Sequence, residues 1–171
     1  MSTESSPDRI YVVDAENRPL AVMSPEEVHA QGLAHRGVLL LITDRRRRLA
    51  LRRLPADHPL HPGRWDVAGS GHVVADEAAE EAAQNRLPAA DLGDNLRHVC
   101  TLAEGAGTGV EIVEVFEAEL SDQAAQTLSR DLSLLFVDRD ELDALVSSFH
   151  DQLSPDLLTV WRTRLYDRSP S

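Results

Sequence analysis

The sequence predicts a mixed fold of the α/β (α+β) class, in which helices pack against a mixed β-sheet within one domain. Short apolar runs interleave with segments that carry helix-capping signals, and the two kinds alternate without a fixed repeat period. The chain has 171 residues with 42% hydrophobic content, which can bury a sizeable core and fits one domain better than two. We expect residues 1–8 to form a disordered polar tail and residues 9–168 to form the domain.

The N-terminal part of the domain is predicted to contain two short strands and a helix. Residues 9–23 show two short extended runs around an Asn-Arg-Pro turn. Ser24 is placed as an N-cap, Pro25 follows it at the first helical position, and Glu27 completes a capping box. These signals predict a short helix that ends at Gly32.

The central part is predicted to begin with a hairpin. Residues 35–44 form a near-continuous apolar run, which is typical of a strand buried on both faces, and residues 48–54 alternate. A proline-containing loop leads to residues 64–73, a predicted strand that opens into a glycine turn, and then to a helix at about residues 76–87.

The C-terminal half is predicted to contain three strands and two helices. A capping box of Asp138 and Glu141 marks the start of one helix, and a Ser-Pro pair at Ser154 marks the start of the other. The predicted segments are strands at 96–104 and 110–120, a strand followed by a helix within 132–149, and a final helix at 154–166.

Charge and composition limit the partners. The net charge of −12 would repel a phosphate backbone from the average surface, and the run of arginines at 45–48 is the one basic candidate, which we interpret as a solvated hairpin turn. The chain shows neither a leader pattern nor an apolar stretch of about 20 residues, and it has a single cysteine, Cys100. We therefore expect a cytoplasmic protein that binds neither nucleic acid nor a membrane. Its oligomeric state is left open.

A family resemblance enters with the stretch "PGRWDVAGSGHV" at residues 62–73. A strand ending in "RR", a proline loop, this stretch and an acidic helix ending in "LG" follow one another in the order found in the Nudix superfamily. The chain resembles in particular the branch that includes type I isopentenyl-diphosphate isomerase and its hydrolase-like relatives, over about residues 10–165. The resemblance implies a Nudix-like α/β/α sandwich with a mixed sheet, and a diphosphate-containing small molecule as partner.

The family's box is only half matched. It has a glycine, a glutamate six residues later and, eight further on, Arg-Glu-apolar-any-Glu-Glu; Gly71 and Glu77 match its first half. In the second half, the positions of the arginine, the first glutamate and the final glutamate pair are taken by Asn85, Arg86, Ala89 and Ala90.

Pro88 also falls where the resemblance requires continuous helix, and proline inside a helix costs about 3 kcal/mol. A shift of the register by one residue recovers only Asp91. In the family these glutamates hold divalent cations that bridge a diphosphate, neutralise its charge and lower the pKa of an attacking water. The sequence therefore predicts impaired hydrolysis through the box.

Acidic residues upstream of these positions are the alternative source of carboxylates. Glu77, Glu80 and Glu81 repeat the spacing of the missing set, but nine residues earlier, which is about 13 Å along a helix axis. They cannot take over the same site. We retain Glu77 and Glu81 as candidate catalytic carboxylates of an altered hydrolytic site; the competing interpretation is an acidic first turn stabilised by the helix dipole.

The isomerase branch implies a different metal site, in which more of the pattern survives. His29, His35, His72 and Glu111 resemble the histidine and glutamate ligands of that branch, and the carbonyl of Gly71 is a further candidate ligand. Imidazole and carboxylate groups suit Mg²⁺ or Mn²⁺. The competing interpretation gives each histidine an ordinary place: on a helix face, at a strand start and at a turn.

Three positions depart from the isomerase pattern. His29 and His35 are six residues apart where seven are expected, and the second glutamate ligand falls at Gly109. Ser70 takes the position of the proton-transferring cysteine, and we keep it as a candidate catalytic residue. A serine hydroxyl replaces a thiol in proton transfer only when it is strongly activated.

Three arginines are candidates for binding the phosphates. Arg52 and Arg53 match the basic pair at the strand end, and Arg64 lies in the following loop. A guanidinium can hold a phosphate through two hydrogen bonds, although ion pairing with the abundant Asp and Glu explains the same residues.

Three functions remain open. The first is a protein like the Nudix hydrolases that acts on a diphosphate-containing small molecule with impaired pyrophosphohydrolase activity. The second is a non-catalytic module that binds such a ligand. The third and weakest is an enzyme like isopentenyl-diphosphate isomerase.

Overall fold

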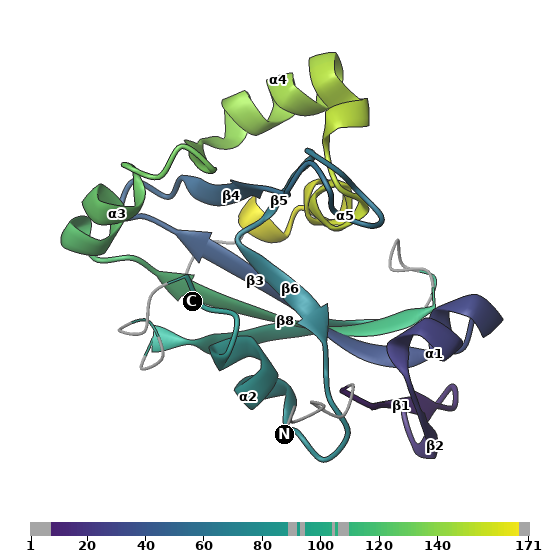
Figure 1. Cartoon of the computed structure of the whole chain (residues 1–171). Coiled ribbons are helices and arrows are strands. Elements are labelled where there is room, and N and C mark those ends of the chain that lie inside the picture. Colours follow the sequence, from purple (N-terminus) through teal and green to yellow (C-terminus); the bar gives the residue numbers. More distant parts are fainter. Residues whose placement is uncertain (1–7, 89–91, 93–94, 104, 106–109, 168–171) are drawn as a thin grey trace, which may run out of the picture.

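The computed structural model describes residues 8–88, 92, 95–103, 105 and 110–167 (Figure 1). Four positions singled out in the sequence, Ala89, Ala90, Asp91 and Gly109, lie outside the described residues. The strands are β1 (Ile10–Val13), β2 (Pro19–Met23), β3 (His35–Thr43), β4 (Leu49–Arg53), β5 (Trp65–Val67), β6 (Gly69–His72), β7 (Arg97–Leu102), β8 (Glu111–Glu119) and β9 (Leu134–Val137). The α-helices are α1 (Pro25–Gln31), α2 (Ala79–Gln84), α3 (Asp122–Leu128), α4 (Arg139–Phe149) and α5 (Pro155–Thr163), with 3₁₀ turns at His150–Gln152 and Leu165–Asp167.

Strand β3 organises the sheet. It pairs with β1, β4 and β6 in antiparallel fashion and with β8 in parallel fashion, while β2 adds to β1, β5 and β9 to β4, and β7 to β8. The predicted mixed sheet is therefore confirmed. The predicted hairpin between β3 and β4 is also present, with Thr43 opposite Leu49.

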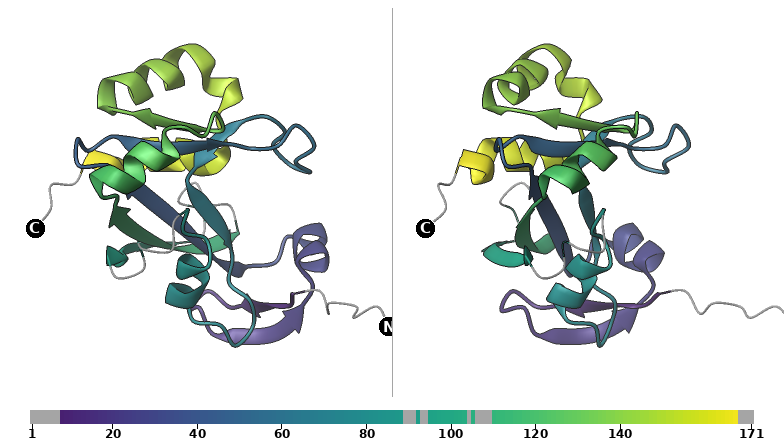
Figure 2. Two further views of the ribbon diagram at one scale, coloured as in Figure 1. Left: turned by 60° about the vertical axis from the view of Figure 1, so that its left-hand side comes forward. Right: turned by 90° about the vertical axis from the view of Figure 1, so that its left-hand side faces the viewer.

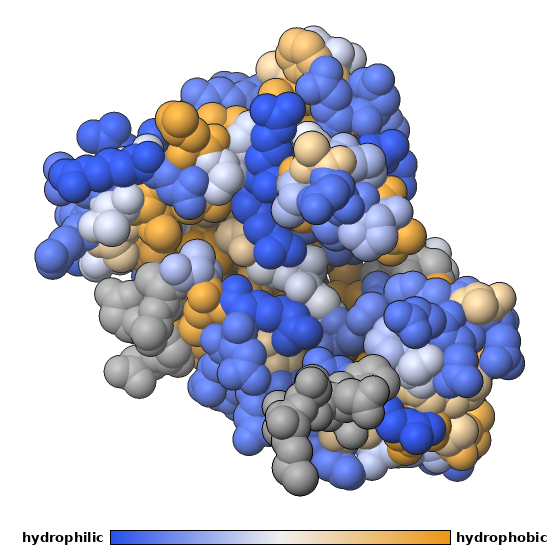
Figure 3. Space-filling view, in the orientation of Figure 1, coloured by the Kyte–Doolittle hydropathy of each residue, from blue (hydrophilic) through white to orange (hydrophobic). Residues whose placement is uncertain are grey.

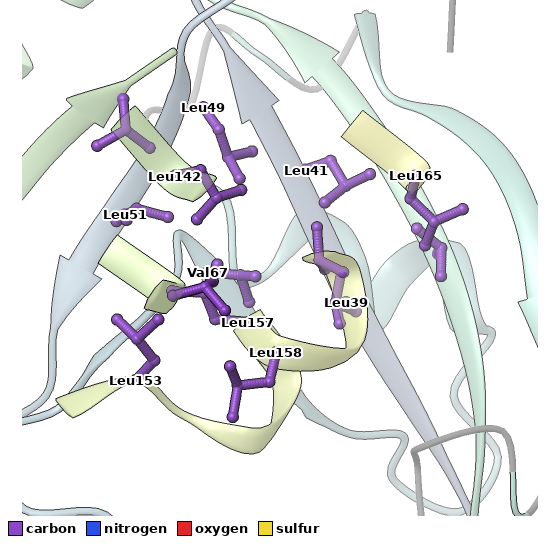
Figure 4. Packing of buried hydrophobic residues seen from close by; sticks show 14 of the residues in the cluster. Leu39, Leu41, Leu49, Leu51, Val67, Leu142, Leu153, Leu157, Leu158 and Leu165 are labelled. Carbon is purple, nitrogen blue, oxygen red and sulfur yellow. The ribbon is translucent and has the colours of Figure 1, made fainter. Parts of the chain in front are cut away.

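Helices cover both faces of the sheet, as Figure 2 shows. Because successive residues of a strand point to opposite faces, β3 contributes to two separate cores. Leu39 and Leu41 pack with residues of α4 and α5 (Figure 4), whereas Leu40 and Ile42 pack with residues of α2 and α3. The α/β/α arrangement and the apolar character of residues 35–44 follow from this double burial.

The helix signals read from the sequence are borne out at three helices. The capping boxes of Ser24 with Glu27 and of Asp138 with Glu141 are both formed, at the starts of α1 and α4. Gly32 ends α1 in the left-handed conformation, with φ of 62°. Ser154 caps α5 by accepting a hydrogen bond from the Leu157 amide.

Three predictions about the elements need correction. The helix predicted at 76–87 is only α2, because Asp76 adopts a φ of 68° in a turn and the helix ends at Gln84, before Pro88. The single strand predicted at 64–73 is two strands, since β5 pairs with β4 and β6 with β3. Helix α3 was not predicted; none of its residues is buried, so the sequence shows no strong apolar stripe there.

None of the described helices is long and apolar enough to cross a lipid bilayer.

We predict that Ser154→Ala destabilises the domain more than Ser121→Ala does. Both serines cap a helix, but the Ser154 hydroxyl is buried and also donates to Asp66 Oδ1 at 2.6 Å. We expect a loss of roughly 1–3 kcal/mol for Ser154→Ala beyond the cost of a lost cap, and about 1 kcal/mol for the exposed Ser121. Urea unfolding of the two variants measures the difference, and equal losses would show that the buried hydrogen bond contributes nothing.

Candidate functional site

The pairing of three strands brings the predicted metal ligands to one end of the sheet. His35 and Glu111 are the first residues of β3 and β8, and they face each other in the parallel register. Gly37, two residues along β3, lies opposite His72 on antiparallel β6. Helix α1 carries His29 to the same end of the sheet, where Figure 1 shows α1, β3, β6 and β8 converging.

The four side chains make direct contacts. His29 Nε2 lies 2.9 Å from His72 Nε2, His35 Nε2 lies 3.0 Å from Glu111 Oε1, and His72 Nε2 lies 3.5 Å from the same oxygen. One ring nitrogen from each of the three histidines falls within 4.8 Å of the others. We call these four residues, His29, His35, His72 and Glu111, the His/Glu cluster.

The donor set of the His/Glu cluster fits a divalent cation. His35 Nδ1 lies 2.9 Å from the Leu33 carbonyl oxygen, which can only accept, so Nδ1 carries the proton and Nε2 is left for the cluster. Gly37 keeps the site open, because a Cβ there would lie 3.3 Å from the Gly71 carbonyl oxygen and 3.5 Å from Glu111 Oε1. Imidazole nitrogens together with a carboxylate are ligands that suit Mn²⁺ and similar ions.

Burial and mutual contacts shift the pKa values within the cluster. Burial lowers the pKa of His72, and the nearby His35, His29 and Arg86 lower it further. Burial also lowers the pKa of His35, but its hydrogen bonds with Glu111 and Leu33 outweigh that effect and raise it overall. Burial raises the pKa of Glu111, but the hydrogen bond from His35 and the other histidines bring it below its usual value. Glu111 is thus held ionised, as a metal ligand must be.

A second polar group adjoins the cluster around Ser70. Ser70 precedes His72 by two residues on β6, so both side chains project to the same face of the strand. Asp156, in the first turn of α5, is close enough to Ser70 for this residue to lower its pKa. Burial, Asp66 and Glu111 raise the pKa of Asp156 to about 7, against the opposing effects of Ser70 and Arg52.

Asp156 was not among the residues predicted from the sequence. In the sequence it stands in "SPD", which looks like an N-cap followed by an acidic first turn. Its proximity to Ser70 and Glu111 arises only from the packing of α5 on the sheet.

Arg86 was recognised in the sequence only as a departure from the box, yet it organises the segment that carries Ser70 and His72. Its guanidinium donates to the carbonyl oxygens of Ser70 at 3.1 Å, Ala82 at 2.9 Å and His72 at 2.9 Å. A Cβ at Gly71 would collide with this guanidinium, so a side chain there would displace Arg86 from its present position. In the register of the resemblance, a fixed positive charge therefore occupies the position of the first box glutamate.

Of the two candidate catalytic glutamates, Glu77 lies in the turn before α2, and Glu81 lies in the first turn of α2. Glu77 accepts hydrogen bonds from the Val74 amide and from Asn85 Nδ2, both at 3.0 Å. Glu81 accepts from the Ala78 amide at 3.1 Å. These contacts give both carboxylates a local structural role, and none of them joins either residue to the His/Glu cluster.

The three candidate phosphate-binding arginines are in different situations. Arg52 Nη2 lies 3.5 Å from Asp66 Oδ2, and Arg52 Nε is buried without a hydrogen-bond partner among the described residues. Arg53 Nε donates to the Gly63 carbonyl at 3.2 Å, within the proline loop. The Arg64 carbonyl accepts a hydrogen bond from the Leu54 amide, and the Arg64 amide donates to the His61 carbonyl. Of the three arginines, Arg52 is the one that acts on a group near the His/Glu cluster, because it lowers the pKa of Asp156, which Glu111 raises.

Curated proteins with similar sequences are a Nudix hydrolase and isomerases. An uncharacterised Nudix hydrolase of Pseudomonas aeruginosa is 31% identical over 83 residues, or 48% of this chain and 49% of that protein. An isopentenyl-diphosphate Delta-isomerase of Burkholderia multivorans is 27% identical over 95 residues, which are 56% of this chain and 51% of that protein. An isopentenyl-diphosphate Delta-isomerase of Serratia proteamaculans is 32% identical over 80 residues, which are 47% of this chain and 45% of that protein. The chain thus spans about half the length of the curated relatives it matches. No protein-family model matches the sequence.

Solved structures share the fold at low sequence identity. DR0079 from Deinococcus radiodurans superposes with a TM-score of 0.74 at 16% identity, covering 91% of this chain and 98% of that one. A mutT/nudix family protein from Listeria innocua gives 0.54 at 14% identity, covering 77% and 94%. Shewanella oneidensis NrtR, also solved with a 27mer DNA, gives 0.51 at 19% identity, covering 76% and 63%.

Because that neighbour binds DNA, the absence of nucleic-acid binding by this chain stays a prediction. The chain has the Nudix fold, and its sequence is similar to a Nudix hydrolase and to isopentenyl-diphosphate isomerases.

Proposed function

We propose that this protein acts on or binds a diphosphate-containing small molecule through a divalent cation, Mg²⁺ or Mn²⁺, held by the His/Glu cluster. The observation that carries the proposal is the convergence of three imidazoles and one carboxylate from α1, β3, β6 and β8. The curated relatives named as a Nudix hydrolase and as isopentenyl-diphosphate isomerases support a diphosphate as the ligand class.

When bound, the cation would supply positive charge to the diphosphate oxygens. The chain itself does the remaining work. The Leu33 carbonyl fixes the tautomer of His35, and Arg86 holds the backbone on either side of Gly71. Arg52, which has one buried nitrogen without a partner among the described residues, is the arginine that we assign to the ligand's phosphates.

We further propose that hydrolysis through the Nudix box is impaired. The guanidinium of Arg86 is fixed by three carbonyl groups close to Gly71, where the resemblance places a metal-binding glutamate. A positive charge at that position repels a cation, whereas a glutamate would bind one. Glu77 and Glu81 are engaged in the local structure around α2, so they do not provide the missing charge.

Two other functions have weaker support. A non-catalytic module is favoured by Arg86, since a ligand can be bound at the His/Glu cluster without being hydrolysed. An isomerase is favoured by the two relatives that bear that name and by Ser70, which stands in place of the cysteine beside the cluster.

We predict that Mn²⁺ stabilises the wild-type protein but not His72→Ala or His29→Ala. At a concentration of about 100 times Kd, binding to the folded state adds about 2.7 kcal/mol, which corresponds to ~5–10 °C in Tm for a domain of this size. Thermal unfolding with and without the metal measures the shift. His29 is exposed, so its loss leaves the core intact.

His98→Ala is the matched control for this prediction. His98 is an exposed histidine that pairs with Glu114, outside the His/Glu cluster. Its variant should keep the full shift. Equal shifts in all four proteins would remove the His/Glu cluster as the metal site.

We also predict that the protein hydrolyses common nucleoside di- and triphosphates with Mg²⁺ or Mn²⁺ at well below about one turnover per second, the low end of usual enzyme rates. The reason is the absence of box carboxylates around Arg86. Phosphate release over a substrate panel, with an EDTA-treated sample as the blank, measures the rate. Turnover of ordinary enzymatic speed would contradict the impaired box.

A further inference from the structure

We propose that a cavity beside the arginine turn, residues 45–48, is a second binding site, which holds the phosphate group of a small phosphorylated molecule without a metal ion. The cavity has a volume of about 360 Å³ and is lined by the turn, the start of α4 and the 3₁₀ turn Leu165–Asp167. Small-molecule sites measure about 300–1000 Å³, so this one suits a small ligand. The site is independent of the His/Glu cluster and of the function proposed for that cluster.

The pairing of β4 with β9 brings two basic segments to this cavity. Leu49 lies opposite Val137 at one end of the antiparallel register. The arginine turn directly precedes Leu49, and the start of α4 follows Val137, so the two segments leave the sheet side by side. Arg46 and Arg47 therefore line the same cavity as Arg139. Guanidinium groups gathered in one place repel one another and match the oxygens of a phosphate, which favours a phosphate as their common ligand.

The other two arginines of the turn are used within the protein itself. Arg48 Nε and Nη2 lie 2.8 Å and 2.7 Å from Oδ2 of the buried Asp44. Arg45 Nη1 lies 3.0 Å from Asp122 Oδ2, at the start of α3. Neither of these two arginines lines the cavity. The basic run thus supplies the cavity with its two middle residues.

The charges that line the cavity leave it positive. In the part of the chain that the structure describes, the Arg46 guanidinium has neither a hydrogen bond nor an ion pair. The two carboxylates of the lining are both engaged: Asp138 Oδ1 accepts from the Glu141 amide at 2.8 Å, and Asp167 Oδ1 lies 3.5 Å from Arg139 Nε. Three arginines against two engaged aspartates make a local positive site in a molecule whose charge is −12.

Apolar side chains form the rest of the lining. Leu49, Val137 and Leu142 belong to the core on which α4 and α5 pack, and Figure 4 shows Leu49 and Leu142 within it. Tyr166 adds an aromatic ring, whose hydroxyl accepts a hydrogen bond from Arg164 Nη1 at 2.7 Å. A phosphate held by the arginines would leave the remainder of its molecule against this apolar surface. The cavity therefore suits a phosphate ester with a small aromatic or apolar part.

A larger groove of about 890 Å³ adjoins the cavity and is less suited to an anion. The groove and the cavity share four lining residues, which are Thr43, Arg47, Leu49 and Tyr166. Two further arginines of the groove, Arg45 and Arg97, form ion pairs with Asp122 and Glu117. Their charges are already offset, so the phosphate belongs in the cavity beside Arg46.

The cavity and the His/Glu cluster lie at opposite ends of β3. His35 of the cluster is the first residue of the strand, and Thr43, which lines the cavity, is the last. At a rise of about 3.3 Å per residue, they are about 26 Å apart. Figure 1 shows α1, which carries His29 of the cluster, at the end of β3 opposite to its arrowhead. A ligand in the cavity would not contact a cation on the cluster, so its binding requires none.

Binding of phenyl phosphate to the metal-free protein tests the site. The probe carries a phosphate group and an aromatic ring, and EDTA in the sample removes any cation from the His/Glu cluster. Isothermal titration calorimetry at low salt should show that wild type binds phenyl phosphate more tightly than inorganic phosphate. Arg46→Ala and Arg139→Ala should each weaken binding of phenyl phosphate about tenfold, because each loses a hydrogen bond between charged groups.

Arg45→Ala is the matched control. It removes the same charge from the same turn, but its guanidinium pairs with Asp122 outside the cavity. Its affinity for phenyl phosphate should stay within a factor of about two of wild type. Arg45 and Arg46 are both exposed, so both variants should fold, which thermal unfolding checks. His72→Ala should also bind the probe like wild type, because the His/Glu cluster takes no part.

Nuclear Overhauser effects locate the bound probe. Protons of the phenyl ring should show contacts with the methyl groups of Leu49, Val137 and Leu142. Equal weakening in Arg45→Ala and Arg46→Ala would indicate general attraction to the basic run and would overturn the site. Loss of binding in His72→Ala would place the probe on the His/Glu cluster and would overturn it as well. Absence of binding to wild type up to about 10 mM phenyl phosphate would have the same consequence.

Discussion

The site depends on one constraint, which is the registration of β3 with β6 on one side and with β8 on the other. The parallel pairing places His35 beside Glu111, and the antiparallel pairing places Gly37 beside His72. A shift of either neighbour by one residue would turn its functional side chain to the opposite face of the sheet. The register is held by burial on both faces, since Leu39 and Leu40 belong to separate cores. The same apolar residues that make the fold therefore also align the polar ones. Strand register positions three of the four cluster residues, and the turn at Gly32 after α1 positions the fourth, His29.

The short segment Ser70–His72 lies between two different chemical environments. The His72 side chain faces the cluster, while the carbonyls of Ser70 and His72 accept hydrogen bonds from the guanidinium of Arg86. Carbonyls two residues apart on a strand point the same way, so one planar guanidinium can bind both. Gly71 makes this possible because any side chain there would occupy the position of the arginine. In the surface view of Figure 3, the molecule is indented between the part formed by α4, α5 and β5 and the part that carries α1. Arg86 thus stabilises by fixed charge a segment of β6 around Gly71, the glycine whose counterpart in the family that the chain resembles is a candidate metal ligand.

The sequence predicted the elements whose signals are local and missed those whose signals are tertiary. Capping residues placed α1, α4 and α5, because an N-cap hydrogen bond spans only three residues. Helix α2 was predicted too long, since acidic residues of the preceding turn look like a first helical turn. Helix α3 was missed because none of its residues is fully buried and its apolar face is weak. At the site, the family resemblance predicted the four residues of the cluster as metal ligands, and in the structure their side chains are in contact. The proximity of Asp156 to the site could not be found in this way, because "SPD" is a common helix start and the position of Asp156 depends on how α5 packs.

The balance of charge at the site bears on the proposal that an anionic ligand is bound through a cation. Asp66 and Glu111 raise the pKa of Asp156, and the nearby Arg52 lies 3.5 Å from Asp66. Three ionised carboxylates would repel a diphosphate, and a single guanidinium that is already paired offsets only one of them. A divalent cation on the His/Glu cluster offsets Glu111 and leaves one positive charge for the ligand. Because the molecule as a whole carries a charge of −12, long-range attraction contributes nothing to binding an anion, and the local arrangement must supply all of it.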